Sequence, residues 1–555
     1  MVFLIAALFI VVFVVGLSRY NAAKKRTAAI ESIDENWGKH TENYRAMNLV
    51  ANYHNYLKTD ASISESIAAD IDLESIFTFT DRTSSKVGQQ YLYHTLRTPQ
   101  TNIADLHALN KLIGTVTADE FKRAALQLEL VALNNANSYY LHELFSSEHK
   151  PLYSAGLSLY IRMAGVLWIA ALVVTIITHA QVLFLLSLGL TLFNFFIHYS
   201  NKKNTLRYVH SMPQLFTLMR VAKYISNQFN IPENEAIVSS LKRAGSLSRS
   251  LRFVKLEDQI SGDPSDLAYA LWELIKAILL IEPAMFIASI NRVNQYRDDI
   301  EVLFNYVGKV DMAVSIQSFR LSLPYFCLPE FSTNCHILNV NALYHLLVEH
   351  CVPNSFQTLD SQGVLITGSN MSGKTTFIRA MAVNALLSQT LFTACAESYD
   401  APLLQLFTSI RVSDDMEEHK SYFQAEALSV LNIMNKSKLN PVKSLVIIDE
   451  IFRGTNTIER VAAAKAILSY FTANQSFVFV STHDLELAEL LGDEYAVYCF
   501  EETVADTRLV FDYKIKPGIL KNKNAIAIMA ALGYPESVIA DAYAMNQQLR
   551  ERYNV

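Results

Sequence analysis

The 555-residue sequence is poor in charge: Asp, Glu, Lys and Arg together make up 18% of it, whereas an ordinary soluble protein carries about a quarter. Hydrophobic residues make up 51%, and the mean hydropathy is +0.18. This shortage of charge predicts membrane segments. Basic residues are not in excess either, because the formal net charge is -6. That argues against a broadly basic surface for nucleic acid, although a local basic patch is compatible with it.

Cysteine is also scarce, and the cysteines are scattered along the chain. Their number is odd and no two form a CxxC pair; they are Cys327, Cys335, Cys351, Cys395 and Cys499. A zinc site or a disulfide framework would need paired cysteines at short or regular spacings, so neither is expected. The pattern indicates reduced thiols in a cytosolic compartment.

The N-terminus is a long uncharged run. Residues 1–18 read MVFLIAALFIVVFVVGLS, which is near the lower limit of length for a membrane-spanning helix. A cleaved signal peptide is the alternative, but its basic residues would precede the apolar run. Here they follow it, at Arg19, Lys24, Lys25 and Arg26. Because positive charge marks the cytoplasmic side, we expect an uncleaved transmembrane anchor with its N-terminus outside.

Residues 163–199 form a second apolar block, which is too long for one span and is broken at His179-Ala180-Gln181. We expect a transmembrane hairpin of two helices of about seventeen residues with a tight turn. Basic residues flank the block on both sides, so both of its ends are expected on the cytosolic side. A helical hairpin buried in a soluble core is the alternative. A weaker apolar stretch, residues 267–290, contains charges and a proline and is expected to be packed soluble helix.

The rest of the sequence divides by its pattern of apolar residues. Spacings of three and four predict helices over residues 27–160 and again over residues 200–324, including a long helix with a polar face over residues 292–320. From about residue 325, short β-rich runs alternate with helical segments. That alternation predicts a doubly wound α/β domain with parallel strands over residues 325–555.

The sequence Gly368-Ser-Asn-Met-Ser-Gly-Lys-Thr375 fits the phosphate-binding pattern G-x-x-x-x-G-K-[ST]. It follows an apolar strand and opens a helix, which is the context that the motif needs. There the glycines let backbone N–H groups close around phosphates at a helix N-terminus. We expect Lys374 to reach the β- and γ-phosphates of ATP, and the Thr375 hydroxyl to bind Mg²⁺.

Two further strand ends carry candidate catalytic residues. The apolar run Leu445–Ile448 is followed by Asp449 and Glu450. After a phosphate-binding loop, we expect the first acid to hold Mg²⁺ and the second to polarise the attacking water. A third strand ends in His483, which we expect to sense the γ-phosphate. By itself, a histidine at a strand end is more often structural.

Together these segments resemble the MutS family of DNA mismatch-repair ATPases. TGSNMSGKTT is similar to that family's TGPNMGGKST, DEIFRGTNTIER to DEIGRGTSTYDG, and STHDLEL to ATHYFEL. Residues 414–423 resemble its DD-x-x-x-GRSTF signature segment, and residues 513–518 its Y-K-(V/L)-x-x-G tail. The resemblance covers roughly residues 325–545. A fainter similarity from Asp81 to Pro99 implies that the upstream helices form the family's core and lever domain.

The resemblance implies an α/β P-loop NTPase of the ABC/MutS type, preceded by an all-α lever and core domain and using ATP and Mg²⁺. It implies a head-to-tail homodimer in which Ser421 of one subunit acts in trans near the γ-phosphate held by the other. Asn354 would lie near the adenine. The nucleotide-binding loop would comprise Gly368, Ser369, Asn370, Met371, Ser372, Gly373, Lys374, Thr375 and Thr376.

The sequence also departs from the family. His419-Lys420 replaces the Gly-Arg before the signature serine, and lysine cannot reproduce the bidentate fork of arginine. We find no N-terminal mismatch-reading domain carrying the family's F-x-E wedge motif, so mismatch recognition does not follow from the resemblance. DNA binding stays open, because basic clusters occur at residues 242–255 and 514–523.

Two other functions compete with a membrane-anchored MutS-like ATPase. One is the ATPase of an ABC-type transport system, but three expected spans are few for a pathway and the exporter signature LSGGQ is absent from the sequence. The other is a nucleotide-gated membrane tether without significant turnover. The intact set of Lys374, Thr375, Asp449 and Glu450 argues against an inactive ATPase.

Overall fold

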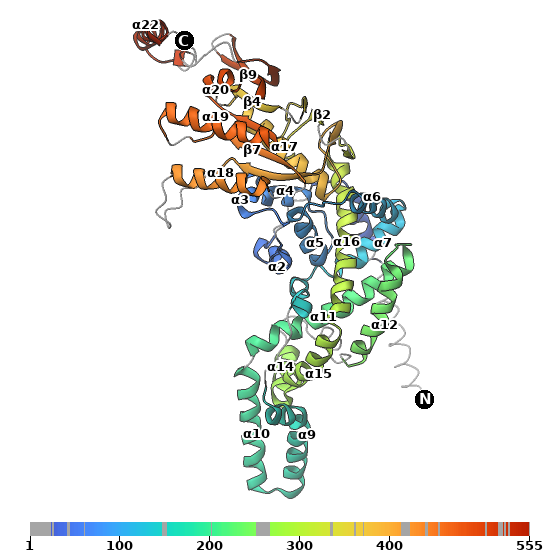
Figure 1. Ribbon diagram of the computed structural model, residues 1–555. Coiled ribbons are helices and arrows are strands. Elements are labelled where there is room, and N and C mark those ends of the chain that lie inside the picture. The colour runs from blue at the N-terminus through green and yellow to red at the C-terminus, as the bar shows by residue number, and fades with distance from the viewer. Residues whose placement is uncertain are drawn as a thin grey trace. The chain divides into compact units, whose positions relative to one another are not determined.

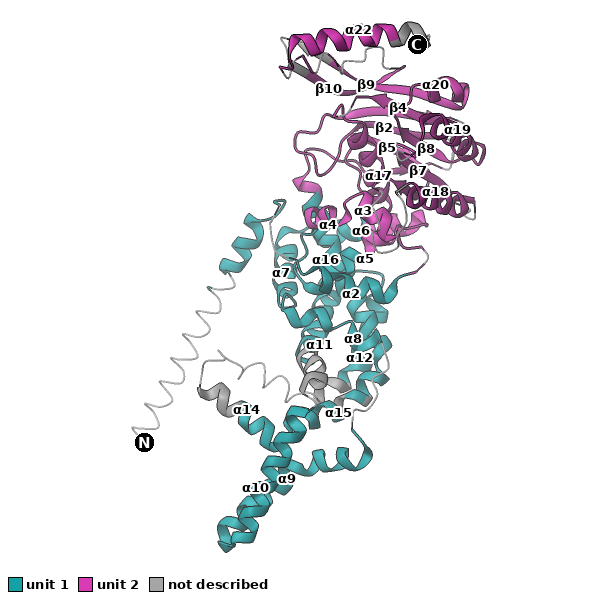
Figure 2. Cartoon of the chain, turned by 90° about the vertical axis from the view of Figure 1, so that its left-hand side faces the viewer, with its two compact units in different colours: residues 1–58, 81–94, 110–319 teal, residues 59–80, 95–109, 320–555 magenta. Residues whose placement is uncertain are grey.

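The computed structural model describes most of the chain, and it carries two compact units (Figure 1, Figure 2). The described residues are 27–40, 45–59, 61–146, 153–200, 202–250, 267–332, 337–359, 362–369, 371–411, 422–438, 442–452, 455–505, 508–519 and 533–553, with a few isolated residues besides. The expected N-terminal anchor, residues 1–18, lies outside them. One unit comprises residues 1–58, 81–94 and 110–319, and the other comprises residues 59–80, 95–109 and 320–555.

The first unit is helical in the residues that the structure describes. Its helices are α2 (Met47–Leu57), α7 (Glu120–Val131), η1 (Ala136–Tyr140), α8 (Glu143–Ser146), α9 (Ala155–Thr178), α10 (Gln181–Ser200), α11 (Lys202–Gln228), α12 (Asn234–Ser250), α14 (Leu267–Leu279) and α15 (Ile281–Gln295). Three helices have residues in both units: α5 (Lys86–Arg97), α6 (Ile103–Thr117) and α16 (Arg297–Ser322).

Helix α16 corrects one expectation. The helix predicted over residues 292–320 is interrupted at Tyr296, and α16 is buried along most of its length rather than showing a polar face. Its polar residues are buried because they bind backbone groups. Asp311 accepts hydrogen bonds from the N–H groups of Ser84 (2.9 Å) and Ser85 (2.8 Å). A Cβ on Gly88 would lie 2.2 Å from an Asp311 oxygen, so this close packing requires glycine.

Helices α9 and α10 form the expected hairpin, side by side in Figure 1. The break is where the sequence predicted it, since α9 ends at Thr178 and His179 takes a left-handed conformation (φ 52°). Both helices are longer than the expected length of about seventeen residues. Helix α9 has 24 residues, because it begins at Ala155 after an N-cap at Ser154, and α10 has 20. In the part of the chain that the structure describes, these two helices are long and apolar enough to cross a membrane, with mean hydropathies of 2.1 and 1.8.

The charged stretch next to the hairpin forms two helices rather than one. Leu280 (φ 51°) separates α14 from α15, and Pro283 lies in the first turn of α15, where its missing N–H is tolerated. The charges there are paired, because Lys276 Nζ lies 2.8 Å from Glu282 Oε1. Leu280 and its neighbours pack against the base of the hairpin in a small apolar cluster with Ile161.

The second unit is a mixed α/β structure, which confirms the predicted class. Its larger sheet has six strands in the order β10-β9-β4-β8-β7-β6, and the pairs from β9 to β6 are parallel. These strands are β4 (Gly363–Gly368), β6 (Leu404–Ser409), β7 (Lys443–Asp449), β8 (Phe477–Ser481), β9 (Tyr495–Ala505) and β10 (Arg508–Pro517). Strands β4 and β8 are buried at every residue, which explains their uninterrupted apolar sequences.

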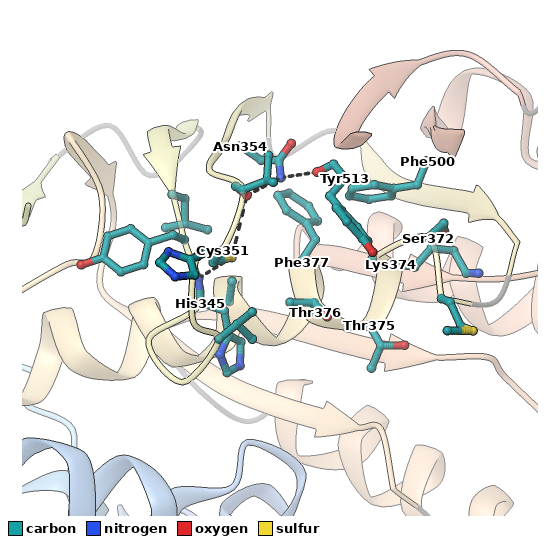
Figure 3. Close-up of a pocket in the computed structure, with 18 of the residues that line it drawn as sticks. His345, Cys351, Asn354, Ser372, Lys374, Thr375, Thr376, Phe377, Phe500 and Tyr513 are labelled. Carbon is teal, nitrogen blue, oxygen red and sulfur yellow. Dashed lines mark hydrogen bonds between the residues drawn. The ribbon is translucent and has the colours of Figure 1, made fainter. Parts of the chain in front are cut away.

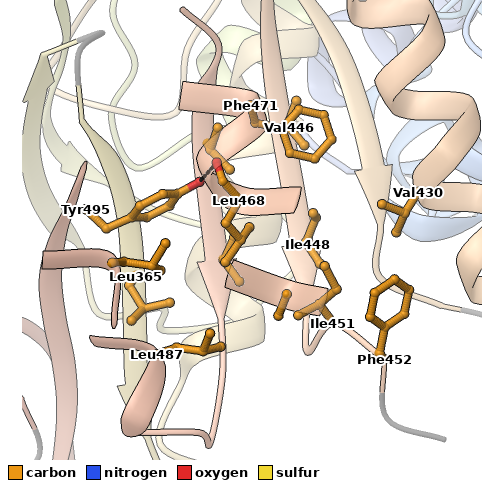
Figure 4. Packing of buried hydrophobic residues seen from close by; sticks show 14 of the residues in the cluster. Leu365, Val430, Val446, Ile448, Ile451, Phe452, Leu468, Phe471, Leu487 and Tyr495 are labelled. Atoms are coloured by element: carbon orange, nitrogen blue, oxygen red, sulfur yellow. Dashed lines mark hydrogen bonds between the residues drawn. The ribbon is translucent and has the colours of Figure 1, made fainter. Parts of the chain in front are cut away.

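The remaining elements of this unit frame the sheet. A smaller sheet has the order β1-β5-β2-β3 and consists of β1 (Glu330–Phe331), β2 (Ile337–Leu343), β3 (Asn354–Leu359) and β5 (Ser398–Ala401). The helices are α3 (Glu65–Asp70), α4 (Leu73–Thr80), α17 (Lys374–Thr390), α18 (Tyr422–Lys438), α19 (Thr457–Ala473), α20 (Glu486–Leu491), η2 (Gly492–Glu494) and α22 (Glu536–Tyr553). Figure 4 shows the apolar core between sheet and helices, where Val446 and Ile448 lie close to Leu468 and Phe471.

Candidate functional site

The turn between β4 and α17 has the backbone that its glycines allow. Gly368 (φ 147°) and Gly373 (φ 110°) both adopt conformations that side chains disfavour. A Cβ on Gly368 would also lie 2.8 Å from the carbonyl oxygen of Phe500 on β9. The turn is tight because the chain must leave a buried strand and begin a buried helix within a few residues. Met371 lies at its outer edge and is 84% exposed.

Lys374, the first residue of α17, points into this turn. Its Nζ donates hydrogen bonds to the carbonyl oxygens of Gly368 and Ser369, at 2.7 Å each. The side chain is 5% exposed, and Ser372 Oγ donates to the same Ser369 carbonyl at 2.9 Å. Main-chain oxygens thus satisfy this buried amino group and hold it beside the turn, where an anion would meet it.

Two oxygen-bearing side chains meet at the start of α17 and the end of β7. Thr375 Oγ1 donates to Asp449 Oδ2 at 3.0 Å, and Ser481 Oγ at the end of β8 donates to Asp449 Oδ1. Asp449 is 8% exposed. A hydroxyl and a carboxylate side by side are hard oxygen ligands of the kind that Mg²⁺ prefers. The donor set therefore fits the expected metal.

Glu450 and His483 also come together. His483 Nε2 lies 2.9 Å from Glu450 Oε1, and both side chains are partly exposed. Glu450 has a left-handed backbone (φ 57°), and its N–H donates to the carbonyl of Ser481 at 3.0 Å. A left-handed backbone is strained for a glutamate, and such strained residues gather at functional sites. Arg460 holds Asp484, the next residue after His483, in a two-point ion pair.

A cavity of about 620 Å³ adjoins these groups. Lys374, Thr375, Asp449 and Glu450 line it, and so do Ser369, Met371, Ser372, Gly373 and Thr376. Figure 3 shows the rings of Phe377, Phe500 and Tyr513 gathered beside Lys374. The cavity therefore combines a polar end with an aromatic wall, and its volume lies in the range of small-ligand sites.

His345 belongs to the opposite wall of this cavity. Burial lowers the pKa of His345 to about 4, so the ring is neutral at pH 7. Its Nδ1 accepts a hydrogen bond from the N–H of Leu347 at 3.2 Å, which places the remaining ring proton on Nε2.

Asn354 is buried, and its side chain forms hydrogen bonds to backbone groups. Its Nδ2 donates to the carbonyls of Tyr513 (3.0 Å) and Val352 (3.2 Å), and its Oδ1 accepts from the N–H of Ile515 (2.9 Å). It thereby fixes the irregular part of β10, where Tyr513 has φ 52°. That it lies near an adenine stays a prediction. Asn370 and Ser421 lie outside the described residues, and their roles also stay predictions.

Three acids that the sequence did not single out hold segments of this unit by accepting hydrogen bonds. Glu502 on β9 accepts a hydrogen bond from Ser369 Oγ at 2.6 Å. Glu426 on α18 accepts from the N–H of Phe452, just after Glu450, at 2.5 Å. Asp70 on α3 accepts from three donors at the end of β6. No motif signals these acids, because each acts on a segment distant in the sequence.

Comparisons with known proteins point to one family. The family profile of MutS domain V matches residues 364–550. A protein named DNA mismatch repair protein MutS from Petrotoga mobilis is 30% identical over 293 residues, which are 50% of this chain and 35% of that protein. Proteins of the same name from Clostridium tetani and Thermus aquaticus are 28% and 29% identical, over 57% and 49% of this chain.

In each case the match spans about a third of the relative's length: 35%, 36% and 33% respectively. The matched part includes the turn around Lys374, the Asp449–Glu450 strand end and the strand that ends before His483. Residues 364–550 therefore match MutS domain V, and about half of the chain is similar to proteins named MutS.

Proposed function

We propose that this chain is a membrane-held ATPase that binds ATP at the Gly368–Thr375 turn and hydrolyses it. The observation that carries the proposal is the position of Lys374 and Thr375. The ammonium group of the first lies inside the turn, and the hydroxyl of the second lies 3.0 Å from Asp449. A phosphate chain needs such a charge, and its Mg²⁺ needs such oxygen ligands, at neighbouring points.

In this proposal the phosphates replace the carbonyls of Gly368 and Ser369 as the partners of Lys374. Thr375 and Asp449 would hold Mg²⁺, which would neutralise charge on the phosphate oxygens. Ser481 fixes Asp449 through its other oxygen, so that the carboxylate keeps one orientation. The aromatic wall formed by Phe377, Phe500 and Tyr513 offers an apolar surface for the base.

Glu450 is the proposed general base. Its carboxylate orients the attacking water and accepts a proton from it. His483, whose Nε2 is 2.9 Å away, holds that carboxylate beside the proposed phosphate site. The Arg460–Asp484 ion pair keeps the loop that carries His483 in place. The exposure of both side chains leaves room for water and for a second subunit.

A second subunit is part of the proposal. By the family resemblance, two chains associate head to tail and Ser421 of each completes the site of the other. Helix α18 begins just after Ser421, and its Glu426 binds the backbone after Glu450. A change of conformation at the signature segment would therefore shift the backbone next to the catalytic carboxylate. Binding and release of ATP would open and close the dimer.

The membrane attachment rests on α9 and α10. Large apolar side chains along both helices are exposed, among them Val166 at 68% and Phe196 at 70%. Monomeric soluble proteins rarely leave so continuous an apolar surface in water. We propose that the hairpin, together with the N-terminal apolar run, places the ATPase at the cytosolic face of a membrane. The curated relatives are named for DNA mismatch repair, and DNA is a candidate partner here.

Replacement of Glu450 by glutamine tests the proposal. E450Q should bind ATP as the parent does and lose hydrolysis by about 100-fold or more, because a general base is removed while the binding groups stay. The matched control is Glu459→Gln, which changes an exposed carboxylate at the start of α19 and should hydrolyse ATP normally. Measurements in detergent with duplex, branched and mismatched DNA would show whether DNA stimulates turnover.

Two results would favour the competing functions. ATP binding by the parent without turnover, even with DNA present, would indicate the nucleotide-gated tether. ATP-dependent solute uptake by vesicles that contain the purified protein would indicate a transport ATPase. Full hydrolysis by E450Q would contradict the proposed role of Glu450.

A further inference from the structure

The first unit contains a separate cavity of about 480 Å³ that the proposed ATPase does not use. Its lining comes from the segment 32–39, Arg45, the turn before α5 and the start of α5, α7 and its C-terminal turn, and α16. Most of its lining side chains are polar. Trp37, which is half-buried, provides an apolar surface and is itself fixed by the Arg123 guanidinium 4.0 Å from its ring.

The charges around this cavity are unbalanced. Among the described residues that line it, four side chains are cationic and one is a carboxylate: Lys39, Arg45, Arg82, Lys86 and Asp81. Two further carboxylates on the packed elements have their own partners. Asp34 pairs with Arg123 at 2.7 Å, and Asp311 accepts from the backbone of Ser84 and Ser85.

Both oxygens of Asp81, the carboxylate in this lining, accept hydrogen bonds. Asp81 Oδ2 accepts from Arg45 Nε and from Gln89 Nε2, both at 2.7 Å. Its Oδ1 accepts from the N–H of Thr83 at 3.0 Å and from the Thr83 hydroxyl at 2.6 Å. Asp81 therefore neutralises and orients Arg45, and the lining of the cavity as a whole keeps an excess of positive charge.

Two of the other cationic side chains, Arg82 and Lys86, are partly buried in the cavity wall, which disfavours their charged forms. Burial lowers the pKa of Arg82 to about 10, and it also lowers the pKa of Lys86. Arg82 stays charged at pH 7. Its backbone N–H is fixed by Ser315 at 2.8 Å, and Lys86 is the first residue of α5 with its Nζ 5.2 Å from the Tyr139 ring. Partly desolvated cations in fixed positions bind an oxyanion more strongly than solvated ones do.

We propose that this cavity binds a ligand through one or more phosphate groups, with Arg82, Lys86 and Lys39 as its charged contacts. The planar guanidinium of arginine matches the paired oxygens of a phosphate. The volume exceeds that of a single phosphate and is typical of a small-molecule site, so the ligand carries more than the anion alone. Such a ligand would join the segment 32–39 to the core of the unit.

Inorganic pyrophosphate is the probe, because it carries the shared chemistry of free phosphorylated molecules and of lipid headgroups. Binding is measured by calorimetry on the full chain in detergent, with Lys374→Ala in every sample to weaken binding at the other site. The variants are R82Q with K86Q, and K39Q alone. The control K111Q removes an equally positive but exposed lysine on α6 that does not line the cavity.

We expect saturable binding that weakens by about tenfold or more in R82Q/K86Q, because charge-assisted contacts are lost. Since K39Q changes only an exposed side chain at the cavity, it should fold normally and bind several-fold more weakly, whereas K111Q should match the parent. Equal binding by the parent, K39Q and R82Q/K86Q would overturn the proposal, as would the absence of saturable binding in the parent.

A second arm distinguishes the sources of the phosphate. The chain is placed in nanodiscs of phosphatidylcholine, with or without phosphatidic acid, and pyrophosphate is titrated again. If the natural ligand is a headgroup, phosphatidic acid should compete and weaken pyrophosphate binding in the parent but not in R82Q/K86Q. Unchanged pyrophosphate affinity in both kinds of nanodisc would assign the cavity to a free phosphorylated molecule.

Discussion

Asp70 offers a sharp test of how the second unit is held together. It lies at the end of α3, is 2% exposed, and accepts hydrogen bonds from the Thr408 hydroxyl (2.6 Å) and the N–H groups of Ile410 (3.1 Å) and Arg411 (2.7 Å). These donors stand at the end of β6. Asp70 thus joins a segment early in the chain to the strand end before the expected signature segment.

Replacement of Asp70 by alanine would leave three donors without their acceptor. Each buried donor that loses its partner costs about 1–3 kcal/mol, and partial relaxation would reduce the sum. We expect a loss of about 3–5 kcal/mol for D70A, in line with other broken buried charge contacts. D70N keeps one acceptor oxygen and should lose about half as much. The nearby Asp72 bonds only to the exposed hydroxyl of Ser75 among the contacts described for its side chain.

The assay is thermal unfolding of the full chain in detergent. For a unit of this size, about 2 °C of melting temperature corresponds to 1 kcal/mol, so D70A should melt about 6–10 °C below the parent. The control D72N should melt within about 1 °C of it. A D70A protein as stable as D72N would refute the reasoning, because it would mean that the three donors find water instead.

The remaining predictions concern packing, pH and the membrane. G88A should cost about 1–3 kcal/mol, because its methyl group would lie 2.2 Å from an Asp311 oxygen, whereas G114A, with nothing within 4 Å, should be neutral or stabilising by up to about 1 kcal/mol. Burial lowers the pKa of His345 to about 4, below the value of about 6.5 in the unfolded chain. The unfolded state therefore takes up this proton first, and stability is lost as the pH falls from about 6.5 towards 4. Between pH 7 and 5 the parent should lose about 2 kcal/mol more than H345N, as measured by urea unfolding. Val166 is exposed in the middle of α9, and V166C in proteoliposomes should not react with a water-soluble maleimide beyond the background of the parent.

Each of these predictions has a contrary outcome. Equal melting temperatures for G88A and G114A would show that the space beside Asp311 is larger than the structure gives. If the free energies of unfolding of the parent and H345N fell equally between pH 7 and pH 5, another group would cause the loss of stability in acid. Rapid labelling of V166C in the membrane-bound protein would favour the hairpin as part of a soluble core.

The sequence predicted best what is local in the chain. The turn around Lys374, the strand ending in Asp449 and the break at His179 are each fixed by a short run of residues, and the structure has a turn, a strand end and a break at those places. Backbone conformation at glycine, burial of continuous apolar strands and a helix stop all act over a few residues. Their roles in chemistry stay predictions.

Long-range contacts were beyond the sequence. The pattern over residues 292–320 predicted a polar face, yet Asp311 and Ser315 of α16 are buried, since they bind the turn before α5. Asp70 and Glu502 carry no motif either, as their partners lie more than a hundred residues away. Only the folded chain shows that these polar residues have buried partners.

The central claim is that Lys374 makes the Gly368–Thr375 turn an ATP site, and steady-state ATP hydrolysis by the purified full chain tests it most directly. With Mg²⁺ present, the parent should hydrolyse ATP, and K374A should lose about 100-fold or more, because it removes the charge that faces the phosphates. The control K436A, at an exposed lysine of α18, should match the parent. Hydrolysis by K374A at the parent's rate would contradict the account.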